Sequence, residues 1–197
     1  MTSSNKLRRG VLMLVFCLGV TGFVGPSSAA TEETAFNLPV ETVADYLYAM
    51  IESDREVYTT HVVERLQAKG VVVASENWKE KNTLPLPAQL LMEAGRVMTR
   101  KGLGIEYRLI SLWPINKRNY GSSDFEKRGL GSVLNHPTKP FTAFVTEGGK
   151  SYFRAVYPDR AVAQSCIGCH NSHPESPKRD FKINDVMGGI VISIPVK

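Results

Sequence analysis

Cysteine is scarce in this chain of 197 residues, which contains only Cys17, Cys166 and Cys169. The last two form one C-x-x-C pair, and there is no second pair to complete the zinc sites that this spacing often builds. A basic helix and an arginine-rich run are also absent, so nucleic acid is not expected as a partner despite a formal net charge of +5. Hydrophobic residues make up 43% and charged residues 22%, which excludes a wholly disordered or fibrous chain.

Residues 1–30 have the pattern of a secretory signal peptide. Basic side chains lie within residues 6–9, an apolar stretch covers residues 11–24, and small residues precede a cleavage point after Ala30. An uncleaved membrane anchor is the alternative, but the apolar stretch is short for a span and no charged stop follows it. We therefore expect a periplasmic or otherwise exported protein with no membrane span after processing.

Processing changes both the charge and the cysteine count. The signal carries three of the 24 basic residues and none of the 19 acidic residues, so its removal lowers the net charge from +5 to +2. Cys17 leaves with the signal, and the bulky Phe16 before it argues against a lipoprotein cysteine. Cys166 and Cys169 are then the only cysteines of the mature chain.

Residues 31–197 are predicted to form one domain of the α+β class. Apolar residues at helical spacing predict a long first helix that ends at Gly70. Strand-like segments follow, with a hairpin turn at residues 147–149 and alternating isoleucines in the last strand. Helices are expected over 41–69, 88–100 and 124–134, and strands over 104–112, 141–146, 150–157 and 188–195. A small sheet with one face covered by helices can enclose a flat ligand.

Cys166, Cys169 and His170 form a C-x-x-C-H motif, the signature of covalent haem attachment. Two thiols at this spacing reach the two vinyl groups on one edge of a porphyrin and form thioethers with them. The adjacent histidine then lies under the ring and offers a neutral imidazole to the iron. A disulfide or a zinc site is the alternative, but haem attaches outside the cytoplasm and uses both mature cysteines. One covalent haem c is therefore the predicted cofactor.

The motif lies near the end of the chain, between two expected strands, which predicts a haem carried on a loop of a sheet domain. Its surroundings read CIGCHNSHPESPKRDFKINDVMGGIVISIPV, and earlier segments read REVYTTHVVERL, NTLPLPAQLLMEAG and GIEYRLISLWPINKRNYGSSDFEKRGL. Together they resemble the c-type haem proteins with a PAS-like fold, over about residues 41–196. The resemblance implies a five-stranded antiparallel sheet with flanking helices, a long N-terminal helix and one haem c.

The same resemblance implies a sensing role, because the family includes small periplasmic proteins and sensor modules of chemoreceptors, histidine kinases and cyclases. This chain has no transmembrane helix, kinase or methyl-accepting region after the domain, so a signal would leave through a partner protein or as an electron. The leading hypothesis is an exported redox or diatomic-gas sensor. A periplasmic electron carrier is the alternative, and a haem enzyme such as a peroxidase is less favoured because no distal acid–base pair is recognisable.

The iron's sixth position needs a donor opposite His170, and His61 is the candidate that we select. It borders the apolar face of the first helix, beside Val62, and is expected to turn inward. An open or water-bound position is the main rival. His136 sits in a turn, His173 is tethered on the side of the axial histidine, and helical methionines more often fill the core. The methionines considered are Met50, Met92, Met98 and Met187.

Residues near the motif have two possible roles each. His173 is expected to contact a haem propionate or to orient the axial histidine, with an ordinary surface position as the alternative. Lys178 and Arg179 are candidates for pairing with the propionates, although solvated charges are more frequent. Trp113 and Tyr120 either pack on the edge of the haem or belong to the core.

We predict that the mature protein begins near Thr31, because signal peptidase cuts after small residues such as those at positions 28–30. N-terminal sequencing of the protein from a periplasmic extract should start within a few residues of Thr31. An intact N-terminus in a washed membrane fraction would contradict this prediction.

Overall fold

The structure is a computed structural model that describes residues 37–196. The predicted signal peptide, residues 1–30, lies outside the described residues. Within the described part, none of the helices is both long and apolar enough to cross a membrane.

The long first helix is confirmed, and it consists of three continuous segments. These are α1 (Val40–Val57), the π-helical segment η1 (Tyr58–Glu64) and α2 (Arg65–Ala68). Gly70 follows with a φ of +65°, a left-handed conformation that glycine adopts without strain. The π-helical segment was not expected from the sequence, and such segments are frequently found at functional sites.

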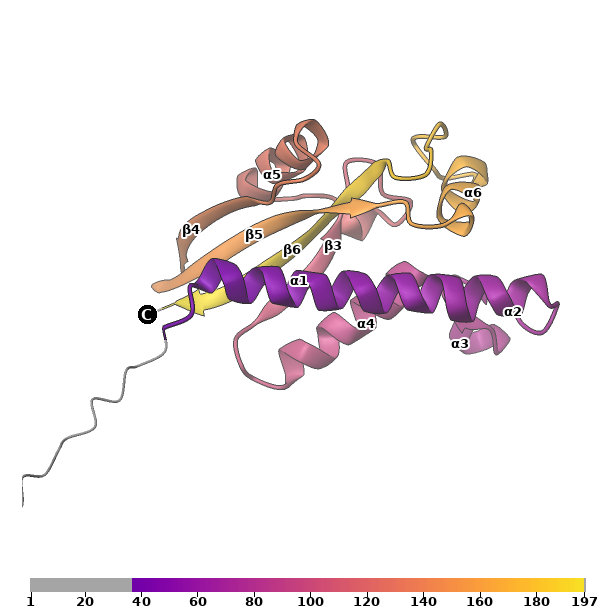
Figure 1. Ribbon diagram of the computed structural model, residues 1–197, viewed down its shortest axis with the longest axis horizontal. Helices are drawn as coiled ribbons and strands as arrows, with labels where there is room; N and C mark the ends of the chain where they lie inside the picture. The colour runs from indigo at the N-terminus through magenta and orange to yellow at the C-terminus, as the bar shows by residue number, and fades with distance from the viewer. Residues whose placement is uncertain (1–36, 197) are drawn as a thin grey trace, which may run out of the picture. The chain divides into compact units, whose positions relative to one another are not determined.

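Four antiparallel strands form the main sheet, in the spatial order β3–β6–β5–β4 (Figure 1). The strands are β3 (Glu106–Ile110), β4 (Phe141–Glu147), β5 (Lys150–Arg160) and β6 (Val186–Val196). The predicted hairpin is confirmed: Glu147 pairs with Lys150, and Gly148 and Gly149 both have positive φ. The α+β class is therefore as expected, and β5 and β6 form its long central pair.

The prediction of a five-stranded sheet is wrong in the number of strands. The segment after β3 contains Pro114, which has no N–H to donate to a ladder. The Asn116 side chain then accepts from the N–H of Arg118 at 3.1 Å and starts the short 3₁₀ helix η2 (Lys117–Asn119). A separate parallel pair, β1 (Ala74–Ser75) with β2 (Leu84–Pro85), adds two short strands outside the main sheet.

Helices cover both faces of the main sheet, not one face as expected. On one face, α1 packs on β5 and β6 and α4 (Pro87–Arg100) packs on β3, through a core that includes Ala44, Leu91 and Phe153. On the other face, α5 (Asp124–Asn135) packs through Phe125, Leu130 and Val133. Figure 1 shows this division, with α5 on one side of the strands and α1 and α4 on the other. The short helix α3 (Trp78–Lys81) lies between β1 and β2 in the chain.

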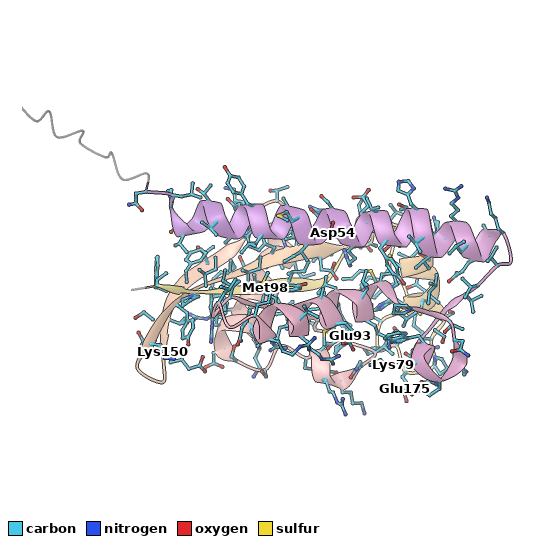
Figure 2. All side chains as sticks on the ribbon, turned by 90° about the horizontal axis from the view of Figure 1, so that it is seen from below. Asp54, Lys79, Glu93, Met98, Lys150 and Glu175 are labelled. Carbon is cyan, nitrogen blue, oxygen red and sulfur yellow. The ribbon has the colours of Figure 1, made fainter. Side chains whose placement is uncertain are left out.

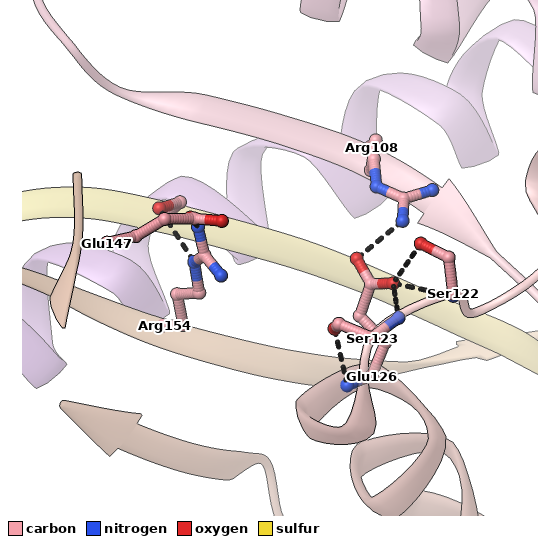
Figure 3. Close-up of polar contacts among 7 residues, drawn as sticks. Arg108, Ser122, Ser123, Glu126, Glu147 and Arg154 are labelled. Atoms are coloured by element: carbon pink, nitrogen blue, oxygen red, sulfur yellow. Dashed lines mark hydrogen bonds and ion pairs between the residues drawn. The ribbon is translucent and has the colours of Figure 1, made fainter. Parts of the chain in front are cut away.

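Glu126 fixes the start of α5 to the sheet (Figure 3). Its Oε2 accepts from the N–H groups of Ser122 and Ser123 at 2.8 and 3.2 Å, and Arg108 of β3 donates to its Oε1 at 2.5 Å. Burial alone would raise the pKa of Glu126, but these hydrogen bonds and the Arg108 charge hold its pKa below the ordinary value. Figure 3 also shows the ion pair between Arg154 and Glu147 on the hairpin.

We predict that Gly129→Ala destabilises the domain by about 1–3 kcal/mol, the usual cost of overpacking. Gly129 lies in α5 against β5, and a Cβ at this position would be 2.5 Å from Cγ2 and 2.9 Å from Cβ of Val156. The matched control is Gly131→Ala in the same helix, where a Cβ would meet nothing within 4 Å. The control should leave the free energy of unfolding unchanged or raise it by up to about 1 kcal/mol. Equal effects of the two changes in urea unfolding would contradict the prediction.

Candidate cofactor cleft

The C-x-x-C-H motif lies on a short helix, α6 (Gln164–Ser172), that connects β5 and β6. The prediction of a loop is therefore wrong. Pro158 and Pro174 lie outside the helix, which ends at Ser172, and His173 directly before Pro174 caps it. Because residues three apart lie on the same side of a helix, Cys166 and Cys169 are neighbours one turn apart.

A cleft with a volume of about 1120 Å³ opens beside α6, and Cys166, Cys169 and His170 all line it. Its other walls come from α1, η1, α3, α4 and the segment after β3. The cleft is larger than the roughly 300–1,000 Å³ of most small-molecule sites, so it has room for a group the size of a porphyrin. Figure 2 labels three residues that line it: Lys79 and Glu175, which are exposed, and Glu93, which is half-buried.

The buried polar atoms that lack a hydrogen bond are all found at this cleft. Within residues 37–196, four side-chain atoms are buried without any partner, and each belongs to a residue that lines the cleft. They are Arg55 Nε, Asn119 Oδ1, Ser165 Oγ and His170 Nδ1. A further buried atom at the cleft, Asp159 Oδ1, has no hydrogen bond but forms an ion pair with Arg55. Buried polar groups are normally paired, so this concentration indicates a site built around a group that supplies the missing partners.

The side chains of the motif have the chemical states that haem attachment requires. Cys166 is half-buried, Cys169 is exposed, and both are free thiols, not a disulfide. Burial raises the pKa of each thiol. His170 is half-buried with its ring edge-on to Phe181, at a centroid distance of 5.8 Å. Burial and the nearby His173 lower the pKa of His170, which favours the neutral imidazole that binds iron.

A buried ion pair lies in the same cleft and was not predicted from the sequence. Arg55 of α1 and Asp159 at the end of β5 are only 8% and 6% exposed, and Arg55 Nη2 lies 2.5 Å from Asp159 Oδ1. Burial raises the pKa of Asp159, although the Arg55 charge opposes this. Arg55 falls in an ordinary amphipathic pattern, and only the tertiary structure brings it to Asp159.

His61 does not join the cleft. It is exposed on η1 and is not among the residues that line the cleft, whereas Val63 of the same segment is buried and does line it. The π-helical segment widens the turn and changes which residues face inward, so the ordinary helical spacing used for His61 does not apply there. This placement gives no support to His61 as a distal ligand. His136, at the end of α5, is also exposed.

The residues after the motif hold their own loop together. The ring of His173 accepts from the N–H of Glu175 at Nδ1, and its Nε2 lies 3.5 Å from Glu76. Lys178 pairs with Asp180, and its ammonium lies over the rings of Trp113 and Phe181.

Arg179, Trp113 and Tyr120 also lie away from the cleft lining. Arg179 donates to the carbonyls of Ser176 and Pro174. Trp113 packs with the small core behind α6, and Tyr120 is exposed. None of these contacts places a cation or an aromatic ring against the cleft. Met92 of α4 and Met187 of β6, considered only as core filler, do line it.

Comparison with known proteins identifies a family. The Tll0287-like family model matches residues 33–195. Among solved structures, the crystal structure of the cyanobacterial heme-protein Tll0287 matches with a TM-score of 0.52 and 14% sequence identity, over 82% of this chain and 98% of that chain. At this identity the likeness concerns the fold. A search of curated proteins finds no match.

We predict that Arg55→Met lowers the free energy of unfolding by about 3–5 kcal/mol, because it leaves Asp159 buried without its counter-charge. The double change Arg55→Met with Asp159→Leu should recover most of this loss, since an apolar pair of similar volume replaces both charges. Urea unfolding of the three proteins makes the comparison. A double variant no more stable than Arg55→Met would show that the buried pair is not what the single change breaks.

Proposed function

Because the chain belongs to the Tll0287-like family, we propose that it is an exported protein that holds one covalent haem c in this cleft. Cys166 and Cys169 form the thioethers, and His170 is an axial iron ligand. The solved structure of Tll0287, whose fold this chain shares, is described as that of a heme-protein. The observation that carries the proposal is the C-x-x-C-H helix beside a cleft that contains every unpaired buried side-chain polar atom of residues 37–196.

Different residues of the chain hold different parts of the proposed haem. The two thiols, one helical turn apart, fix one edge of the ring, and His170 presents its imidazole from the same helix. The N-terminus of α6 is anchored to η1, where the N–H of Ser165 donates to Glu64 Oε1 at 3.0 Å. The bound haem supplies one-electron chemistry and a site for small ligands.

The physiological role that we propose is redox or diatomic-gas sensing. Among residues 37–196, His170 is the one histidine that lines the cleft, which supports a sixth position that is open or weakly held. A site of this kind binds external ligands, as a gas sensor requires. The signal would pass to a partner protein, whose identity the site does not specify.

An electron carrier is the second candidate, and one observation favours it. Met92 and Met187 line the cleft, and methionine opposite histidine is the ligand pair of many electron-transfer cytochromes. Met187 packs with Cys166 and Ile167 in the small core behind α6, whereas Met92 comes from a different wall. Met92 is therefore the methionine to test for ligation.

We predict that the exported protein keeps its haem through denaturing electrophoresis and stains for haem-linked peroxidase activity. Cys166→Ala with Cys169→Ala should abolish the stain, because no thioether can form. The matched control is Gly168→Ala between the two cysteines, where a Cβ would meet nothing within 4 Å, and it should keep the stain. Loss of the colour from the unaltered protein on acid–acetone extraction would refute covalent attachment.

We also predict that the reduced holoprotein binds carbon monoxide and nitric oxide with shifts of its Soret band, because the sixth position is open or weakly held. Met92→Leu should leave the spectrum of both redox states unchanged if the role is sensing. A low-spin spectrum that resists both gases, and that becomes high-spin in Met92→Leu, would instead assign the protein to electron transfer.

A further inference from the structure

Arg55 has an unused donor in the cleft. Its Nη2 lies 2.5 Å from Asp159 and donates to the carbonyl of Arg160 at 3.2 Å, so one end of the guanidinium is fully engaged. Its Nε is buried and has no hydrogen-bond partner within residues 37–196. The side chain is more than nine-tenths buried and lines the cleft. An unpaired N–H of a buried charged group destabilises the folded protein unless a bound ligand accepts its hydrogen bond.

The backbone at Arg55 and the position of its partner Asp159 are both fixed by the fold. Thr59, the first buried residue of η1, donates from its hydroxyl to the carbonyl of Arg55 at 2.7 Å. Asp159 sits at the register shift where β5 leaves its regular pairing with β6. Such irregularities commonly re-aim a side chain next to a functional site. The guanidinium is therefore positioned by α1 and by the end of β5.

The charge of Arg55 and its place in the cleft indicate the kind of group that it meets. Arg55, Asp159 and Cys166 all line the cleft, so the unused Nε donor belongs to a wall of the space beside the thiols. A charged donor forms its strongest hydrogen bonds to an acceptor that carries negative charge. The described residues supply no second histidine to the cleft besides His170, so the sixth position of the proposed haem iron can hold such an acceptor.

We propose that Arg55 donates a hydrogen bond from Nε to a small anionic ligand carried by the haem iron. This inference rests on the proposed haem site and names the class of ligand that the site selects: anions, and neutral diatomic molecules that gain negative charge when they bind. Asp159 holds the guanidinium in place, so the positive charge is fixed before the ligand arrives. The Arg55–Asp159 pair then favours the binding of ligands that accept a hydrogen bond.

The test is to measure the affinity of the ferric holoprotein for azide, fluoride and imidazole by optical titration. Arg55→Lys keeps a cation beside Asp159 but removes the Nε donor. It should weaken azide and fluoride binding by about tenfold or more, as expected for one lost hydrogen bond to a charged group. Imidazole accepts no such bond from Arg55 and should bind as before. The control is Arg96→Lys, an exposed cation that lines the same cleft and pairs with Glu93, and it should change none of the affinities.

Other outcomes overturn the inference. Unchanged anion affinity in Arg55→Lys, together with a shifted midpoint potential, would assign Arg55 to a propionate. An equal loss for imidazole would mean a general disturbance of the cleft. A wild-type protein that binds no anion would have a filled sixth position, while its haem stain would leave the proposed haem attachment standing. If Arg55→Lys does not fold, Arg55→Met with Asp159→Leu replaces it and should show the same selective loss.

Discussion

Buried polar atoms need hydrogen-bond partners, and this constraint is broken at one place in the described structure. The unpaired atoms come from α1, α6 and the segment after β3, which are far apart in the chain and meet at the cleft. Elsewhere the polar groups are well paired, as around Glu126, where two backbone N–H groups and Arg108 surround one carboxylate. The contrast points to this cleft, whose wall also carries the C-x-x-C-H motif.

The rest of the fold supports that cleft. The β5–β6 pair passes through the middle of the sheet and carries α6 on the connection between its two strands. The long first helix packs on one face of the same sheet and continues past it as η1, which receives the N-terminus of α6 through Glu64. The cysteines and Arg55 therefore belong to elements that are anchored to the same sheet and joined through Glu64. A rigid frame of this kind can hold a large planar group with two short covalent links and one iron ligand.

Local chemistry determined what could be predicted from the sequence. The hairpin at Gly148 and Gly149, the Ser123 helix start and the long first helix follow from turn residues, capping and periodicity, and the structure confirms them. The resemblance to a family of haem proteins is confirmed by the family match and by the fold shared with the heme-protein Tll0287. The five-stranded sheet that the resemblance implied is not found: the main sheet has four strands, and two short strands pair separately.

The parts that were missed depend on tertiary contacts. The choice of His61 assumed ordinary helical spacing across what is a π-helical segment, and it chose a side chain that is exposed. Arg55 and Asp159 are 104 positions apart, and neither has a local signal that distinguishes it from a surface charge. Pairs of this kind become visible only when burial and distance are known.

The central claim is that Cys166 and Cys169 carry a haem, and one measurement tests it most directly. Trypsin should release residues 161–178, which contain the whole motif between Arg160 and Arg179. Tandem mass spectrometry of this peptide from the exported protein should show the added mass of one haem on the two cysteines. An unmodified peptide, or one lighter by the two hydrogens of a disulfide, would contradict the account.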